Sequence, residues 1–190
     1  MARRRGVGAC SAQAMRAPLV SGLVAVLLAA AVGPAGAHVT LVSPAPRTLD
    51  NKAGPCGAAG STRGANVATF KPGETITVVF DETVDHPGHY RIAFDDDGED
   101  AFQNPNNPND NFPSTLKEPI ADKAGGRYME QVTLPNKTCT NCTLQLIQVM
   151  TTVVPYNSFY YQCADLVLSD TAPGGGGSGS GTGPQMGGCA

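Results

Sequence analysis

The sequence predicts an all-β domain, an antiparallel β-sandwich of the immunoglobulin or fibronectin type III kind with long loops. Short segments rich in Val, Ile, Thr, Tyr and Phe alternate with turn-forming residues along the chain. No stretch shows a sustained helical period with capping residues. The segment with this pattern covers about 135 residues, from 38 to 172, which suits one sandwich domain.

Six segments have the composition of strands. They cover residues 38–43, 75–80, 89–94, 128–134, 143–150 and 159–168. Two long connections interrupt them, over residues 45–66 and 95–123, and the second contains the run FQNPNNPNDNFP, whose Asn and Pro residues favour turns. Long loops on a rigid sandwich are where a binding surface is usually built.

The first 37 residues are predicted to be a secretory signal peptide. Arg3, Arg4 and Arg5 supply a positive start, residues 19–32 are apolar, and Ala35-Gly36-Ala37 has the small-residue pattern of a cleavage site. We therefore expect cleavage after Ala37 and a secreted protein, extracellular or periplasmic, with no membrane partner. An uncleaved N-terminal anchor is the alternative.

Residues 173–190 are expected to form a flexible tail. The run GGGGSGSGTGPQMGG has too few apolar residues to bury a surface. Cys189 lies in this tail, and no role is assigned to it.

The predicted mature chain is acidic. Four of the thirteen Lys and Arg residues lie in the leader, so nine remain against sixteen Asp and Glu. This balance argues against nucleic acid or an anionic membrane as a partner and is compatible with binding a cation. We expect a monomer.

The cysteines suit an oxidising compartment. We prefer the disulfides Cys139–Cys142, which would close a tight loop, and Cys56–Cys163, which would tie an early loop to the last strand. Four cysteines permit three pairings. A zinc site is the competing interpretation of the C-x-x-C spacing, but no second such pair or histidine pair accompanies it.

The chain has three histidines, His38, His86 and His89. Cleavage after Ala37 would make His38 the N-terminal residue, whose imidazole and free amine can chelate a metal together. His86 and His89 flank a turn before a predicted strand, and either could supply a second imidazole. Three nitrogen ligands in this arrangement suit Cu(II), which prefers tetragonal nitrogen ligation.

Four motifs occur in order along the domain: HVTLVSPAPR after the cleavage site, DHPGHYRIAF, CTNCTLQL and SFYYQCADLVL. Together they resemble the lytic polysaccharide monooxygenases, copper enzymes with a histidine brace, and are most similar to small bacterial single-domain members. The resemblance implies one copper ion per chain, bound by His38 and His86, with His89 as the rival second ligand. It also implies that Tyr160 lies on the axial side of the metal, so that His38, His86 and Tyr160 would be the catalytic residues.

The resemblance further implies oxidative cleavage of glycosidic linkages in a chitin- or cellulose-like polysaccharide, with an external electron donor. His89, Gln162 and Gln148 are then candidates for polar groups behind the ligands. The chain has no Trp. Recognition of sugars would therefore depend on Tyr156 or on the Asn- and Pro-rich loop, through hydrogen bonds more than stacking.

Two other functions stay open. HVTLVSPAP followed by TITVVFDETVD also resembles periplasmic copper carriers, which begin with histidine and do not catalyse oxidation, so the sequence leaves open whether the protein is an enzyme. A sandwich domain without a metal is the third possibility. Hydrolysis has little support, because the run DDDGED is typical of a solvated surface and no G-x-S-x-G motif is present.

Overall fold

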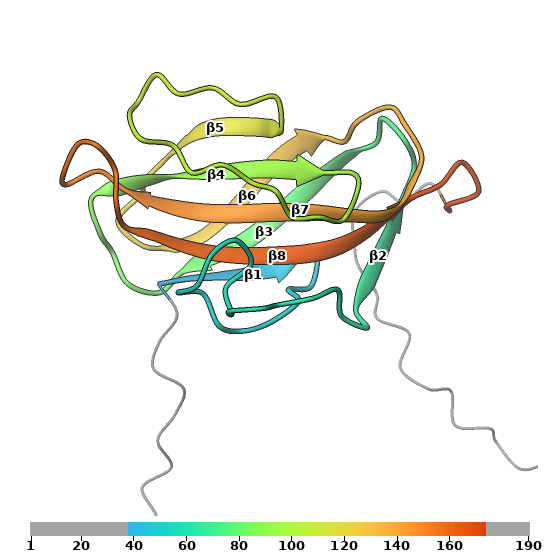
Figure 1. Ribbon diagram of the computed structural model, residues 1–190, viewed down its shortest axis with the longest axis horizontal. Coiled ribbons are helices and arrows are strands. Elements are labelled where there is room, and N and C mark those ends of the chain that lie inside the picture. Colours follow the sequence, from blue (N-terminus) through green and yellow to red (C-terminus); the bar gives the residue numbers. More distant parts are fainter. Residues whose placement is uncertain (1–37, 174–190) are drawn as a thin grey trace, which may run out of the picture. The chain divides into compact units, whose positions relative to one another are not determined.

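The computed structural model describes residues 38–173, and eight strands in two sheets make up their regular structure (Figure 1). The predicted all-β sandwich is confirmed. The predicted leader and nearly all of the predicted tail, including Cys189, lie outside the described residues. Within the described part of the chain, no helix is long and apolar enough to cross a membrane.

The smaller sheet has three antiparallel strands in the order β1-β3-β6. They are β1 (Val39–Ser43), β3 (Thr75–Glu82) and β6 (Gly126–Thr133). In β3 every second residue is buried, as expected of a strand with one face on the core. The pairing of Val39 with Glu82 places the start of β1 beside the end of β3.

The larger sheet has five strands in the order β2-β8-β7-β4-β5. They are β2 (Val67–Phe70), β4 (Gly88–Asp95), β5 (Thr115–Ala121), β7 (Cys139–Met150) and β8 (Phe159–Leu168). The edge strand β2 runs parallel to β8, and the other pairs are antiparallel. Strands β2 and β5 were not predicted from the sequence, and the parallel pair departs from the purely antiparallel sandwich expected.

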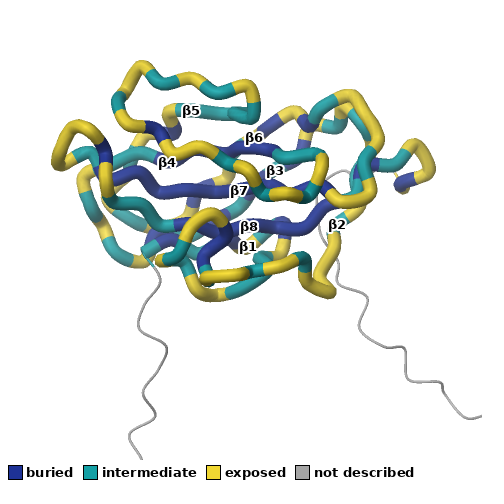
Figure 2. Tube along the Cα trace, viewed as in Figure 1, coloured by how far each residue is buried: buried dark blue, intermediate teal, exposed yellow. Residues whose placement is uncertain are grey.

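The main core lies between the two sheets, where Figure 2 shows buried segments on strands of both. Phe80, Tyr90 and Tyr128 meet there, and the rings of Phe80 and Tyr128 stack with centroids 4.6 Å apart. Each fully buried large apolar side chain contributes about 1.5–3 kcal/mol by leaving water. The packing of these rings therefore holds the two sheets in a fixed relation.

A second, smaller core lies on the other side of β7 and contains Ile147, Val149, Tyr156 and Tyr161. The loop before β5 covers this face, because the Tyr156 amide donates to the Asn106 carbonyl at 2.8 Å. This cluster covers Ile147 and Val149, and the loop after β1 covers Thr143 and Gln145 on the same face, so β7 is buried continuously from Cys142 to Met150.

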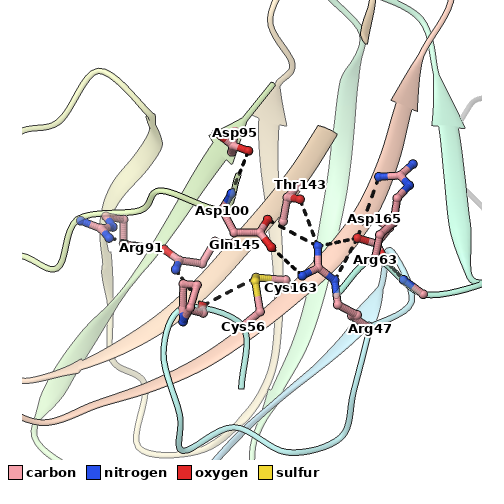
Figure 3. Close-up of a disulfide and its surroundings, with 12 residues drawn as sticks. Arg47, Cys56, Arg63, Arg91, Asp95, Asp100, Thr143, Gln145, Cys163 and Asp165 are labelled. Atoms are coloured by element: carbon pink, nitrogen blue, oxygen red, sulfur yellow. Dashed lines mark hydrogen bonds and ion pairs between the residues drawn. A yellow bond between two sulfur atoms is a disulfide. The ribbon is translucent and has the colours of Figure 1, made fainter. Parts of the chain in front are cut away.

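Two disulfides are present, Cys56–Cys163 and Cys139–Cys142, which is the pairing preferred from the sequence. The first connects the loop after β1 to β8, 107 residues further along the chain (Figure 3). Gly57 follows Cys56 with a φ of 94°, and a Cβ there would lie 2.0 Å from the Asp50 carbonyl oxygen. Glycine is therefore required where this loop folds closely on itself beside β8.

Three chain segments meet at one end of the sandwich, on the left in Figure 1: the start of β1, the β3–β4 connection and the start of β8. These segments carry His38, His86 and Tyr160.

Candidate metal centre

His38 lies immediately before β1 and is fixed by its own backbone and that of its neighbour. Its carbonyl accepts a hydrogen bond from the Thr83 amide at 3.1 Å, which extends the β1–β3 pairing by one residue. The carbonyl of Val39 accepts another from Asn51 Nδ2 at 3.2 Å. His38 is therefore held between β3 and the loop that follows β1.

The imidazoles of His38 and His86 lie face to face. Their ring centroids are 4.9 Å apart and their planes differ by 12°. His86 is brought there by the β3–β4 connection, and Gly88 allows the chain to turn from it into β4. A Cβ at Gly88 would lie 2.4 Å from the Val149 carbonyl oxygen, so this position accommodates only glycine without a backbone shift.

Nε2 of His86 is buried and has no hydrogen-bond partner among the described residues. A buried polar atom without a partner is costly, and in native proteins it calls for an ordered water or ion to satisfy it. The unpartnered nitrogen lies on a ring stacked beside a second imidazole. This donor set fits a metal of the class that imidazole prefers, which includes copper.

Tyr160, on β8, forms the second contact of His38. Its ring stacks on the His38 imidazole with centroids 3.8 Å apart and planes inclined by 13°. Nζ of Lys52 lies 4.0 Å from the centroid of the Tyr160 ring. The site thus combines two imidazoles, one phenol and one ammonium group, drawn from both sheets and from the loop after β1.

Burial lowers the pKa of His38, and the nearby charges of His86 and Lys52 lower it further. The neutral imidazole, which is the form that binds a metal, is therefore favoured at His38.

His89 is not brought to His38. It lies on β4, where its Nε2 is 2.9 Å from Oε1 of Glu118 on β5, and its ring meets that of Tyr156 edge-on at 6.1 Å. The structure thus places His86, and not His89, against His38.

Both glutamines predicted to lie behind the ligands are buried. Gln162 accepts a hydrogen bond from the Leu41 amide and donates to the carbonyls of Thr48 and Leu49 at 3.2 and 3.4 Å, so it ties β8 to β1 and the following loop. Nε2 of Gln148 donates to Glu82 Oε1 and Tyr90 Oη, both at 3.1 Å. Neither glutamine is hydrogen-bonded to the two imidazoles in the described part of the chain: Gln162 connects β8 to β1 and its loop, and Gln148 bonds to core residues.

The sequence reasoning did not select Lys52 or the network around Arg47. Arg47 lies in the loop after β1 and pairs with Asp165 on β8 and Asp100, as Figure 3 shows. Asp165 is the charged residue within the otherwise apolar run CADLVL, and this position could have indicated a buried ion pair from the sequence alone. No comparable signal marked Lys52.

Residues 36–176 match the sequence profile of a protein family described as "Copper acquisition factor BIM1-like". No curated protein and no solved structure matches the chain. The match covers the whole described domain and supports copper as the metal. It does not confirm a lytic polysaccharide monooxygenase, and it agrees better with the copper-carrier alternative. The chain belongs to the BIM1-like family of copper acquisition factors.

Proposed function

We propose that this protein is a secreted copper-binding protein that captures a copper ion outside the cytoplasm and holds it for transfer. Its ligands are the imidazoles of His38 and His86 and, after removal of residues 1–37, the free amine of His38. One observation supports this proposal above the others: the buried, unpartnered Nε2 of His86 lies on a ring stacked against His38. Membership of the BIM1-like family also indicates copper as the metal.

The residues around the ligands prepare the site before copper arrives. The carbonyl of His38 and the side chain of Asn51 fix the start of β1. Tyr160 packs against the His38 ring, which limits the rotation of this imidazole. A bound copper ion would accept these nitrogens as ligands, and a carrier function would require no chemistry beyond this coordination. Preorganised ligands lower the ordering cost of binding.

Leader removal is the step that completes the ligand set in this proposal. Before cleavage the nitrogen of His38 is part of a peptide bond and lacks the basic lone pair of an amine. The precursor would therefore bind copper with imidazoles alone, and the processed protein would gain a third nitrogen. In this proposal, export through the predicted signal peptide brings the protein outside the cytoplasm, and the same cleavage frees the His38 amine as the third ligand.

The decisive experiment compares the chain that begins at His38 with the same chain carrying one extra Ala in front. Cu(II) affinity and the paramagnetic resonance spectrum are measured for both, and mass spectrometry verifies each N-terminus. We expect tight binding with mostly nitrogen ligation in the first protein and markedly weaker binding in the second. Equal, weak binding by both would refute the proposal.

Oxidation of a polysaccharide at the same centre is the second candidate function. The stacking of Tyr160 on His38 favours it, because the resemblance to lytic polysaccharide monooxygenases implies an aromatic ring on the axial side of the metal. In that case chitin- or cellulose-like chains and an external electron donor would be the partners. Incubation of the copper-loaded protein with polysaccharide, reductant and peroxide distinguishes the two functions: oxidised sugars indicate the enzyme, and their absence together with copper transfer to an acceptor chelator indicates the carrier.

A further inference from the structure

Lys52 places a positive charge beside the metal centre. Its Nζ lies 4.0 Å from the centroid of the Tyr160 ring, and the Tyr160 centroid lies 3.8 Å from that of His38. The ammonium, the phenol ring and the imidazole thus form a chain of contacts. A cation over an aromatic face is held there by the ring quadrupole, with a strength of about 0.5–1 kcal/mol at exposed sites.

The backbone on both sides of Lys52 is fixed to the strands that carry His38 and Tyr160. Asn51 donates through Nδ2 to the Val39 carbonyl at 3.2 Å and accepts at its own carbonyl from the Tyr161 amide at 2.7 Å. On the other side, Ala53 and Gly57 exchange two backbone hydrogen bonds around the disulfide-bonded Cys56. The position of Lys52 relative to the metal centre is therefore built into the fold.

The charge of Lys52 lies beside the centre, because only the Tyr160 ring separates its ammonium group from the His38 imidazole. No ion pair within residues 38–173 neutralises Lys52. The ammonium group therefore contributes a positive potential where a cation would bind.

A positive potential discriminates between ions of different charge. The repulsion between Lys52 and a bound ion is proportional to the charge of that ion, so it is twice as large for Cu(II) as for Cu(I). We infer that Lys52 is a specificity-determining residue of the metal centre, whose ammonium group weakens the binding of Cu(II) more than that of Cu(I). This inference rests on the proposed function, because it requires copper to bind at His38 and His86.

The test uses exported protein whose leader has been removed, with the N-terminus at His38 verified by mass spectrometry. Dissociation constants for Cu(II) and for Cu(I) are measured by competition with chromophoric chelators in the unmodified protein and in Lys52→Met, Lys52→Arg and Lys71→Met. Lys52→Arg keeps the charge. Lys71→Met removes the same charge from an exposed lysine next to the turn before β3, at the opposite end of that strand from Glu82.

We expect Lys52→Met to bind Cu(II) about three- to tenfold more tightly and Cu(I) with a smaller gain, since the charge is solvent-exposed and partly screened. Because the Cu(I) gain is then the square root of the Cu(II) gain, the ratio of the two constants should change about two- to threefold. This corresponds to a fall of about 14–30 mV in the one-electron reduction potential, which voltammetry measures separately. Lys52→Arg and Lys71→Met should keep the unmodified ratio. High salt should reduce the difference between Lys52→Met and the unmodified protein.

An unchanged ratio in Lys52→Met, or an equal change in Lys71→Met, overturns the inference while leaving copper binding intact. A different result marks failure of the proposed function itself: the unmodified protein binds neither ion tightly, and His86→Ala changes nothing. Lys52 is exposed, so its replacement should not prevent folding, and a thermal melt of each variant verifies this.

Discussion

Arg47 and Asp165 form a buried ion pair, in which Nη2 of Arg47 lies 2.6 Å from Oδ1 of Asp165 and the two side chains are only 3% and 0% exposed. Arg47 also donates to Asp100 at 2.7 Å and to Thr143 at 3.1 Å. Burial works against the charge of Arg47, but the hydrogen bonds and charges of Asp100 and Asp165 outweigh burial and raise its pKa. The pair attaches the loop after β1 to the centre of β8.

Asp165→Asn should lower the free energy of unfolding by about 1.5–3 kcal/mol, because it weakens the charge-assisted hydrogen bonds of Arg47 to Asp165 while Asp100 still pairs with the guanidinium. Urea unfolding measures the change. Asp81→Asn is the matched control, since Asp81 on β3 pairs with the exposed Arg127 on β6 and should matter far less. The double variant Arg47→Met/Asp165→Leu should recover part of the loss, since it removes both charges. Equal effects of Asp165→Asn and Asp81→Asn would contradict this account.

The two disulfides should differ in their contribution to stability. Cys56–Cys163 closes a loop of more than one hundred residues, and Cys139–Cys142 joins cysteines only three positions apart. Chain-entropy arguments assign about 4–5 kcal/mol to a loop of the first size and about 2 kcal/mol to one of the second. Replacement of each pair by alanine, followed by thermal and urea unfolding, should therefore destabilise the domain more in Cys56→Ala/Cys163→Ala. The reverse order would show that the unfolded chain is not constrained in this way.

Alkaline solution should destabilise the fold through its buried tyrosines. Burial raises the pKa of Tyr128 to about 12 and also raises the pKa values of Tyr90 and Tyr161. In the unfolded chain these groups lose their protons near pH 10. Stability from their protonated form is thus complete below about pH 10 and is lost as the pH rises toward the folded pKa values. Urea unfolding between about pH 9 and 11.5 should show a falling free energy of unfolding, with tyrosinate absorbance appearing in the unfolding transition. A constant free energy across this range would refute the expectation.

Copper affinity should depend on His86 and not on His89. The ring of His86 stacks against His38, while that of His89 contacts Glu118 and Tyr156. Loss of one nitrogen ligand typically weakens a metal site by orders of magnitude, so His86→Ala should bind Cu(II) at least about one hundredfold more weakly. His89→Ala should bind like the unmodified protein. Titration calorimetry in a competing weak ligand measures both, and a larger loss in His89→Ala would assign the second ligand to that residue instead.

The strands with strong local signals were predictable. Thr75–Glu82 and Phe159–Leu168 consist largely of residues that favour strands, and the structure extends or reproduces the predicted limits. Strand Val67–Phe70 was missed because it is only four residues long and has no buried residue. Its extended conformation depends on its pairing with β8, which the local sequence does not indicate. Strand Thr115–Ala121 contains a proline and pairs with β4 through two register shifts, so its local pattern resembles a loop.

The candidate site was predictable in part. His38 could be selected because an N-terminal histidine after a cleavage site has a specific chemistry, and the turn before β4 drew attention to His86. The choice between His86 and His89 depends on which way the chain leaves β3, a tertiary property. Lys52 contacts Tyr160 and Arg47 pairs with Asp165, each more than one hundred residues further along the chain, and no local sequence pattern predicts such contacts.

His38 is held against the three-stranded sheet, and Tyr160 belongs to the five-stranded one. A copper ion bound at this centre would act as a clamp between the two layers, whereas the unfolded chain would keep only the weaker local chelate of His38. By mass action, each tenfold excess of free copper over its dissociation constant should add about 1.4 kcal/mol to the stability of the folded state. Resistance to heat would then report copper loading: the copper-bound protein should survive conditions that unfold the copper-free one, and loss of copper should leave a protein that is easier to degrade.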